Sequence, residues 1–161
     1  MQALSLRSKR CRCLVFLPAA LATILSDPAL AHPVIGITDG DTITVLVDKR
    51  PVKIRLANID APERKQAFGT RSRQSLSDLC WGEDATYEVQ DIDRYKRVVG
   101  VVKCGGVEVN RAQVERGMAW VYPKYNKEKT LPELQERARA ERRGLWADKE
   151  PVAPWEWRRK R

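Results

Sequence analysis

The stretch VIGITDGDTITVLVDKRPVKIRL, residues 34–56, decides the fold because it contains three β-strand patterns in quick succession. The first apolar run ends at the turn dipeptide Asp39-Gly40, and an alternating run follows directly. In residues 52–56 the apolar side chains fall on one face of a strand, with Lys53 and Arg55 on the other. We therefore expect Arg55 to point away from the apolar face of its own strand.

The rest of the chain continues this pattern with two more strands and a few helices. We predict a helix over 69–82, strands over 86–91 and 97–103 around a polar turn, a short helix from Asn110 to Gly117, and a helix opened by the capping box Thr130 and Glu133 and ending at Gly144. Five short strands with about three helices are typical of a small, curved OB-fold β-barrel (α+β). The tail, residues 151–161, contains Trp155 and Trp157, and we expect it to pack as a clasp because exposed tryptophans are costly.

The amino-terminal segment has the pattern of a secretory signal. Four basic residues between 7 and 12 precede an apolar run, residues 13–25, and a small-residue site at 29–31. We predict cleavage between Ala31 and His32, a single mature domain over 32–161, and export to the periplasm or the medium. The alternative is a membrane anchor, but this run is shorter than the roughly 20 residues that a bilayer span requires.

Charge and cysteine content narrow the choice of partner and compartment. The chain carries 30 basic and 21 acidic residues, and this excess attracts polyanions such as nucleic acids without proving that they bind. Of the four cysteines, Cys80 and Cys104 follow the predicted signal. In an oxidising compartment we expect them to form a disulfide, with two buried free thiols as the alternative. Their spacing and the lack of histidine partners argue against zinc.

The chain contains one histidine, and this removes many hydrolase mechanisms. His32 would begin the mature chain, where a lone histidine is more often solvated than catalytic. Two-histidine ribonuclease chemistry is therefore excluded, and serine or cysteine nucleophiles would lack their usual base. What remains is a set of carboxylates and arginines at strand ends and turns.

Two acidic turns supply the carboxylates. Residues 39–42 read Asp-Gly-Asp-Thr, and residues 60–63 read Asp-Ala-Pro-Glu. Each is also a good turn sequence with solvated acids, and the first is no EF-hand because Arg50 stands where a glutamate ligand is required. Together, Asp41 and Asp60 offer hard oxygen ligands for Ca²⁺ with Glu63 close by, and two arginines can grip a phosphate. Those are the parts that phosphodiester hydrolysis needs.

At these residues the chain resembles the staphylococcal nuclease (thermonuclease) family. The matching segments, in order, are residues 39–42, 54–56, 60–63, 93–97, 109–110, 117–119 and 144–146. The resemblance implies a five-stranded OB-fold barrel of the staphylococcal nuclease type and hydrolysis of DNA and RNA to 3′-phosphate and 5′-hydroxyl ends. It also implies these roles: Asp41, Asp60 and the backbone carbonyl of Ala61 bind calcium, Glu63 orients or deprotonates water, and Arg55 and Arg97 hold the scissile phosphate.

Other residues are candidates for substrate binding. Tyr95, Tyr122 and Tyr125 can stack on bases or contact a terminal phosphate, and the alternative for each is a core tyrosine; the match to the family is loosest at Tyr122. The basic side chains Arg94, Lys96, Lys124 and Lys127 can attract the phosphate backbone. Lys96 departs from the family, which usually has glycine there, and a positive φ at this position would strain a lysine. The segment after Glu63 is also short for the family.

Two other classes of function compete with a nuclease. One is a non-catalytic nucleic-acid-binding module, and the other is a structural OB domain. Neither has a use for a metal cluster beside two arginines, so the acids and arginines together favour a hydrolase. We expect a monomer.

Overall fold

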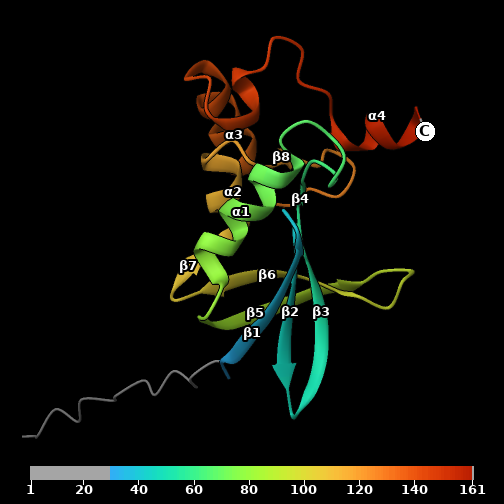
Figure 1. Cartoon of the computed structure of the whole chain (residues 1–161), viewed down its shortest axis with the longest axis vertical. Helices are drawn as coiled ribbons and strands as arrows, with labels where there is room; N and C mark the ends of the chain where they lie inside the picture. Colours follow the sequence, from blue (N-terminus) through green and yellow to red (C-terminus); the bar gives the residue numbers. More distant parts are fainter. Residues whose placement is uncertain (1–29, 161) are drawn as a thin grey trace, which may run out of the picture.

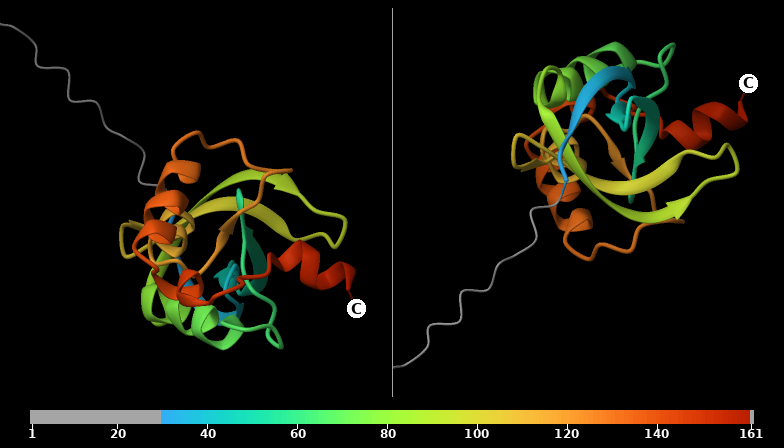
Figure 2. Two further views of the ribbon diagram at one scale, coloured as in Figure 1. Left: turned by 90° about the horizontal axis from the view of Figure 1, so that it is seen from above. Right: turned by 90° about the horizontal axis from the view of Figure 1, so that it is seen from below.

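The structure is a computed structural model that describes residues 30–160. Its main sheet has the strand order β3-β2-β1-β5-β6-β7, and a further parallel pairing of β3 with β6 closes the five long strands into a barrel (Figures 1 and 2). The OB-type barrel predicted from the sequence is confirmed. The strands are β1 (His32–Asp39), β2 (Thr42–Val47), β3 (Arg50–Leu56), β4 (Ile59–Asp60), β5 (Asp84–Ile92), β6 (Val98–Cys104), β7 (Val107–Glu108) and β8 (Trp120–Val121).

Three helices and a 3₁₀ turn lie toward one end of this barrel, and a fourth helix projects to one side (Figure 1). The first three, α1 (Gly69–Cys80), α2 (Val109–Glu115) and α3 (Leu131–Ala140), are followed by a 3₁₀ turn, η1 (Gly144–Ala147), and a short fourth helix, α4 (Pro154–Arg159). The predicted third helix ends at Ala140, because Gly144 begins η1 instead of ending α3. Nearly all of the predicted signal segment lies outside the described residues, so its cleavage stays a prediction.

Alternating apolar side chains build the barrel core, as the strand patterns predict. Ile43 and Val45 of β2 and Ile54 and Leu56 of β3 are fully buried. Lys53, on the other face of β3, is exposed. The register pairs Thr42 with Arg55, and this places the Asp39-to-Asp41 turn beside the end of β3. Strand pairing therefore brings the first acidic turn and the first arginine together.

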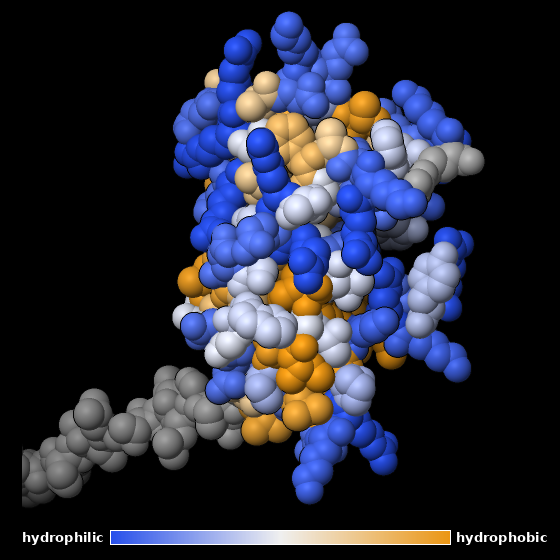
Figure 3. All heavy atoms as spheres, in the orientation of Figure 1, coloured by the Kyte–Doolittle hydropathy of each residue, from blue (hydrophilic) through white to orange (hydrophobic). Residues whose placement is uncertain are grey.

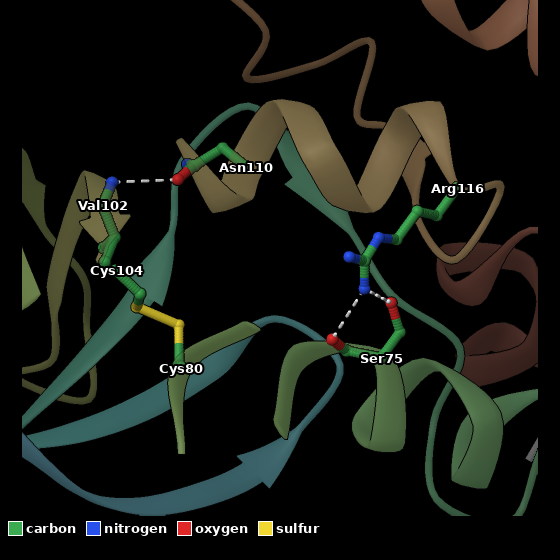
Figure 4. The surroundings of a disulfide bond; sticks show 6 residues. All are labelled: Ser75, Cys80, Val102, Cys104, Asn110 and Arg116. Carbon is green, nitrogen blue, oxygen red and sulfur yellow. Dashed lines mark hydrogen bonds between the residues drawn. A yellow bond between two sulfur atoms is a disulfide. The ribbon is translucent and has the colours of Figure 1, made fainter. Parts of the chain in front are cut away.

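A disulfide and a buried polar network attach α1 and α2 to the barrel. Cys80 at the end of α1 is bonded to Cys104 at the end of β6, with an S–S distance of 2.02 Å (Figure 4). Asn110 accepts a hydrogen bond from the Val102 amide at 2.9 Å and donates to the carbonyls of Ala57 and Gly100. Arg116 at the end of α2 donates to Ser75 of α1. These contacts fix both helices relative to the strands.

Three local predictions are wrong, because each of these side chains has a different partner or environment in the folded chain. Asn110 does not cap α2; its amide joins strand backbones instead. The Thr130 hydroxyl donates to Glu128 rather than capping α3. His32 is not solvated, because β1 buries it with its ring 5.8 Å from that of Tyr87.

The carboxy-terminal tail packs as a clasp, as predicted. Ala153 and Pro154 are buried, and the Trp155 ring stacks on Tyr122 with 5.2 Å between centroids and 4° between planes. Figures 1 and 2 show α4 and the β5–β6 turn projecting on the same side of the barrel. Hydrophilic side chains dominate the face seen in Figure 3, and apolar ones gather over the strands in its lower half. Within residues 30–160, no helix is long and apolar enough to cross a membrane.

Candidate active site

Two buried aspartates and one arginine form the centre of the site. Arg55 Nη2 donates to Asp60 Oδ1 at 2.9 Å and to Asp41 Oδ2 at 3.3 Å. The Asp60 and Asp41 side chains are only 2% and 9% exposed, and that of Arg55 is 16% exposed. A charged hydrogen bond in such surroundings is stronger than one in water, and loss of either partner would leave an uncompensated buried charge. We call Asp41, Arg55 and Asp60 the acid cluster.

The backbone around the acid cluster holds Asp41 in one orientation. Its Oδ2 accepts a hydrogen bond from the Ala61 amide at 3.0 Å, and its Oδ1 accepts one from the Thr42 hydroxyl, also at 3.0 Å. A side chain at Gly40 would overlap Ser72, so the turn lies against α1 only because it has glycine there. Buried Gln113 of α2 donates to the Gly40 carbonyl at 2.7 Å. The two helices therefore position the acidic turn.

Burial and mutual repulsion disfavour negative charge among these carboxylates. Burial and the neighbouring charge of Asp41 raise the pKa of Asp39 to about 7. Burial also raises the pKa of Asp60, and the hydrogen bond from Arg158 opposes that shift. A positive charge placed near Asp39 or Asp60 therefore stabilises the ionised form of these carboxylates.

Glu63 lies beside the acid cluster on the loop between β4 and α1. Its side chain is 38% exposed, so water reaches it. Its amide donates to Gln66 Oε1 at 3.1 Å, and the Gln66 Nε2 donates to the Val152 carbonyl at 2.6 Å. Gln66 thus ties the Glu63 loop to the segment that leads into α4.

Arg158 of α4 also enters this site, and no sequence motif predicted it. Arg158 Nη2 donates to Asp60 Oδ2 at 2.7 Å, and Nη1 donates to Glu63 Oε1 at 2.8 Å and to Asp60 Oδ1 at 3.3 Å. Burial tends to lower the pKa of Arg158, but the hydrogen bonds to Asp60 and Glu63 outweigh it and raise the pKa. The two tryptophans of the tail predicted that the tail packs against the barrel. No sequence pattern predicted which basic residue of the tail would contact Asp60 and Glu63.

Arg97 lies apart from the acid cluster. Its Nε donates to Asp93 Oδ2 at 2.7 Å, and its guanidinium lies over the Tyr95 ring at 5.6 Å. In the described part of the chain it makes no hydrogen bond or ion pair to Asp41, Asp60 or Glu63. Burial tends to raise the pKa of Asp93, but hydrogen bonds from Arg97 and Tyr95 outweigh it and lower the pKa.

Lys96, beside Arg97, has the positive φ that the sequence comparison with the family suggested. Its φ is 61°. This left-handed conformation is ordinary for glycine and strained for lysine. The Lys96 amide still closes the turn by donating to the Asp93 carbonyl at 2.9 Å, so the turn forms despite that strain.

The three candidate tyrosines fall into two groups. Tyr95 and Tyr125 are 64% and 55% exposed, so their rings are open to a base. Arg94 lies over Tyr95 and Lys124 over Tyr125, at 4.8 and 5.3 Å from the ring centroids. Tyr122 packs between Trp155 and Tyr125, and Arg55 lies 6.0 Å from its centroid. Tyr122 is therefore part of the packing that supports the site.

Lys127 lies away from the acid cluster, in a polar cavity of about 310 Å³. Its backbone amide donates to Asn58 Oδ1 at 3.0 Å. The cavity is also lined by three glutamates, Glu88, Glu108 and Glu128. Acidic surroundings of this kind do not favour a phosphate backbone, so Lys127 is a weaker candidate for substrate binding than Lys124.

The carboxylates of the acid cluster have the chemistry of a cation site. In this structure they accept hydrogen bonds from the guanidinium groups of Arg55 and Arg158. Asp41 Oδ2 and Asp60 Oδ1 both face one nitrogen of Arg55, so two hard oxygen donors converge on a single positive centre. Among residues 30–160 no group of three or more His, Cys, Asp or Glu side chains is arranged around a metal-sized point. Glu63 is turned toward Arg158 instead.

Comparison with known proteins gives a consistent result. A family model described as Staphylococcal nuclease homologue matches residues 53–148. A Shigella flexneri protein named Micrococcal nuclease is 43% identical over 155 residues, which cover 88% of this chain and 89% of that protein. An Escherichia coli protein named Uncharacterized endonuclease is 45% identical over 143 residues, which cover 86% of this chain and 94% of that protein. The residues matched by the family model include Arg55, Asp60, Glu63 and Arg97, and α4 lies beyond them.

Proposed function

The chain belongs to the staphylococcal nuclease homologue family, and we propose that it is an exported, calcium-dependent nuclease that cleaves DNA and RNA to 3′-phosphate and 5′-hydroxyl ends. Family membership and the names of its relatives make it a nuclease hydrolase. The finer proposal depends chiefly on one observation. Asp41, Arg55 and Asp60 are hydrogen-bonded together at one edge of the barrel, with Glu63 beside them.

Asp41 and Asp60 are the proposed cation ligands, joined by the Ala61 carbonyl. Carboxylate and carbonyl oxygens are the ligands that calcium prefers. The pairing of both aspartates with one guanidinium nitrogen shows that their oxygens converge, so the residues present fit such an ion. When bound, the ion would neutralise charge that develops on the phosphate oxygens.

Glu63 is the proposed general base. It lies next to the buried aspartates but remains partly open to solvent, so a water molecule can reach both Glu63 and a phosphate in the site. A positioned carboxylate in this location can orient that water and accept its proton. Its loop is held by Gln66, and this limits the positions the carboxylate can take.

Arg55 and Arg97 are the proposed phosphate-binding groups. Asp93 accepts hydrogen bonds from the Arg97 amide and from Nε of its guanidinium, so within the described residues the Nη1 and Nη2 fork has no hydrogen-bond partner. Such a fork matches two phosphate oxygens. Arg55 is already oriented by Asp41, Asp60 and the Leu56 carbonyl.

Exposed aromatic and basic side chains would bind the nucleic acid without reading its sequence. Tyr95 and Tyr125 can each stack on any base, and Arg94, Lys96 and Lys124 add attraction for phosphates. Recognition of this kind does not depend on a particular base, and we therefore include both DNA and RNA as substrates.

The Cys80–Cys104 disulfide supports the proposed export. Structural disulfides persist mainly in oxidising compartments such as the periplasm and the extracellular medium. The basic, apolar and small-residue order of residues 7–31 supports it independently. We propose that the mature enzyme begins at His32 and acts as a monomer.

The test is digestion of plasmid and single-stranded DNA and of RNA by the mature protein, with Ca²⁺ or a chelator. We expect cleavage only with Ca²⁺ and a loss of at least about 100-fold in Glu63→Gln, because the base is removed while the fold is kept. Polynucleotide kinase should label the products without prior phosphatase treatment, because 5′-hydroxyl ends accept phosphate directly. Tight DNA binding without cleavage would instead identify a binding module.

A further inference from the structure

Arg158 bonds Asp60, which is one of the proposed cation ligands, and Glu63, which is the proposed base. Its guanidinium forms a two-pronged pair with both carboxylate oxygens of Asp60 and a third hydrogen bond to Glu63. Asp60 is almost fully buried, whereas the Arg158 side chain is 41% exposed and reaches in from the surface. A guanidinium and a divalent cation cannot share these oxygens closely, because their like charges repel in a poorly hydrated site.

Contacts of the tail with the rest of the chain hold Arg158 in this position. Trp155, one turn before Arg158 in α4, stacks on Tyr122 and meets Trp120 edge-on at 5.7 Å. The segment before α4 is held by the hydrogen bond from Gln66 to the Val152 carbonyl. Gln66 also accepts a hydrogen bond from the Glu63 amide. The Glu63 loop is therefore attached to the tail twice, through Gln66 to Val152 and through the Glu63 carboxylate to Arg158.

We propose that Arg158 is a built-in competitor for the divalent cation, which must displace the guanidinium from Asp60 and Glu63 to bind. This inference rests on the proposed cation site and adds a residue that sets how much cation the enzyme needs. Because the cation binds only those molecules in which Arg158 has left Asp60, the apparent Kd for the cation is the intrinsic Kd divided by the fraction of molecules in that open state. The displaced arginine stays close to the site because the aromatic contacts of Trp155 do not involve the guanidinium.

The chain contains a matched control for this proposal. Arg159, the next residue in α4, is 75% exposed, and its ion pair is with Glu156 on the same helix at 3.8 Å. Arg158→Ala and Arg159→Ala remove the same charge from the same helix. A difference between them therefore reports the contact with the acid cluster rather than the general field of the tail.

The experiment is calorimetric titration of Ca²⁺ into the mature protein and the variants, without nucleic acid. We expect Arg158→Ala to bind Ca²⁺ on the order of tenfold more tightly than the wild type, and Arg159→Ala to stay close to the wild type. Arg158→Gln should bind more tightly in the same way while retaining a hydrogen-bond donor, so it serves if the alanine variant does not fold. In a chelator, Arg158→Ala should melt at a lower temperature than Arg159→Ala, because Asp60 loses a partner.

The outcomes separate this inference from the proposed function. Equal Ca²⁺ affinity in the wild type, Arg158→Ala and Arg158→Gln overturns the competition and leaves the cation site standing. An equal gain in Arg158→Ala and Arg159→Ala overturns it too, because the effect would then be general charge. No Ca²⁺ binding by any of the proteins overturns the cation site and the competition together.

Discussion

Arg55 and Arg97 are predicted to bind the same phosphate, but they reach the site from different kinds of backbone. Arg55 belongs to a barrel strand, and its side chain is 16% exposed and bonded to two buried aspartates. Arg97 follows a turn with a strained lysine, and its side chain is 28% exposed and bonded to one nearby aspartate. Strand pairing fixes the first position, whereas a five-residue turn fixes the second.

This difference separates the contribution of each arginine to stability from its contribution to catalysis. Arg55 compensates buried charge, so it serves the fold and the site together. Asp93, the partner of Arg97, has an 18% exposed side chain and also accepts hydrogen bonds from the Tyr95 and Arg97 amides. Loss of the Arg97 side chain therefore leaves a carboxylate that still has partners and is less buried than Asp60. Substitutions should therefore affect both stability and rate at Arg55, and rate alone at Arg97.

The largest expected effect is that of Arg55→Ala. It removes the partner of Asp41 and Asp60, and we expect a loss of roughly 3 kcal/mol in the free energy of unfolding at neutral pH, together with a rate reduced at least about 100-fold. Denaturant unfolding and initial rates of DNA digestion measure the two. Arg158 also pairs with Asp60, so unchanged stability would mean that this second arginine compensates fully and that Arg55 is not needed for the fold.

Arg97→Ala should lose rate and keep stability. We expect a fall of about 100- to 1,000-fold in the initial rate, typical of removing one group that stabilises transition-state charge. The free energy of unfolding should change by less than about 0.5 kcal/mol, as for other surface substitutions. Arg94→Ala, in the same turn, is the control and should cost far less rate. Near-full activity in Arg97→Ala would remove it from the phosphate site.

The sequence predicted the Arg55 half of this comparison better than the Arg97 half. Alternation in residues 52–56 fixes the face of Arg55, and the β2–β3 register then brings the Asp41 turn to it. Asp60 follows closely in the chain, on β4. No local pattern determines where the Arg97 side chain turns, because it depends on the turn and on whether Asp93 or a phosphate is its partner.

Long-range contacts were the least predictable features. The Arg158–Asp60 pair joins residues 98 positions apart and depends on how the tail packs after the barrel has formed. The predicted cap at Asn110 failed for a related reason, since its amide takes partners that the tertiary fold supplies. The cap at Thr130 failed for a local reason, because its hydroxyl donates to Glu128 two residues earlier. The family resemblance predicted the acids and arginines, which lie in its motifs, but it gave no position for α4.

Asp93→Asn should have a smaller effect than loss of Arg97 itself. The amide keeps the size of the side chain but weakens its hold on the guanidinium, so we expect a rate reduced about tenfold through misplacement of Arg97. The lowered pKa of Asp93 means that its contribution is present at neutral pH and lost only as the pH falls below its usual value of 3.8. A rate–pH profile of the wild type should therefore show no step from Asp93 between pH 5 and 8. An unchanged rate in Asp93→Asn would show that Asp93 does not position Arg97.

The smallest effect is expected for Lys96→Gly. This substitution tests whether Lys96 displaces Arg97 or only strains the turn before it. The φ of Lys96 is already left-handed at 61°, so glycine can adopt the same backbone without moving Arg97. We expect a gain of about 0.5–1 kcal/mol in the free energy of unfolding, from relief of strain less the added freedom of the unfolded chain. The rate should change less than about threefold.

Lys49, with φ of 64° in the β2–β3 turn, is the matched control, and Lys49→Gly should give a similar gain in stability. A rate increase above tenfold in Lys96→Gly alone would mean that lysine displaces Arg97, and the difference between the two arginines would then come from this one substitution rather than from strand and turn.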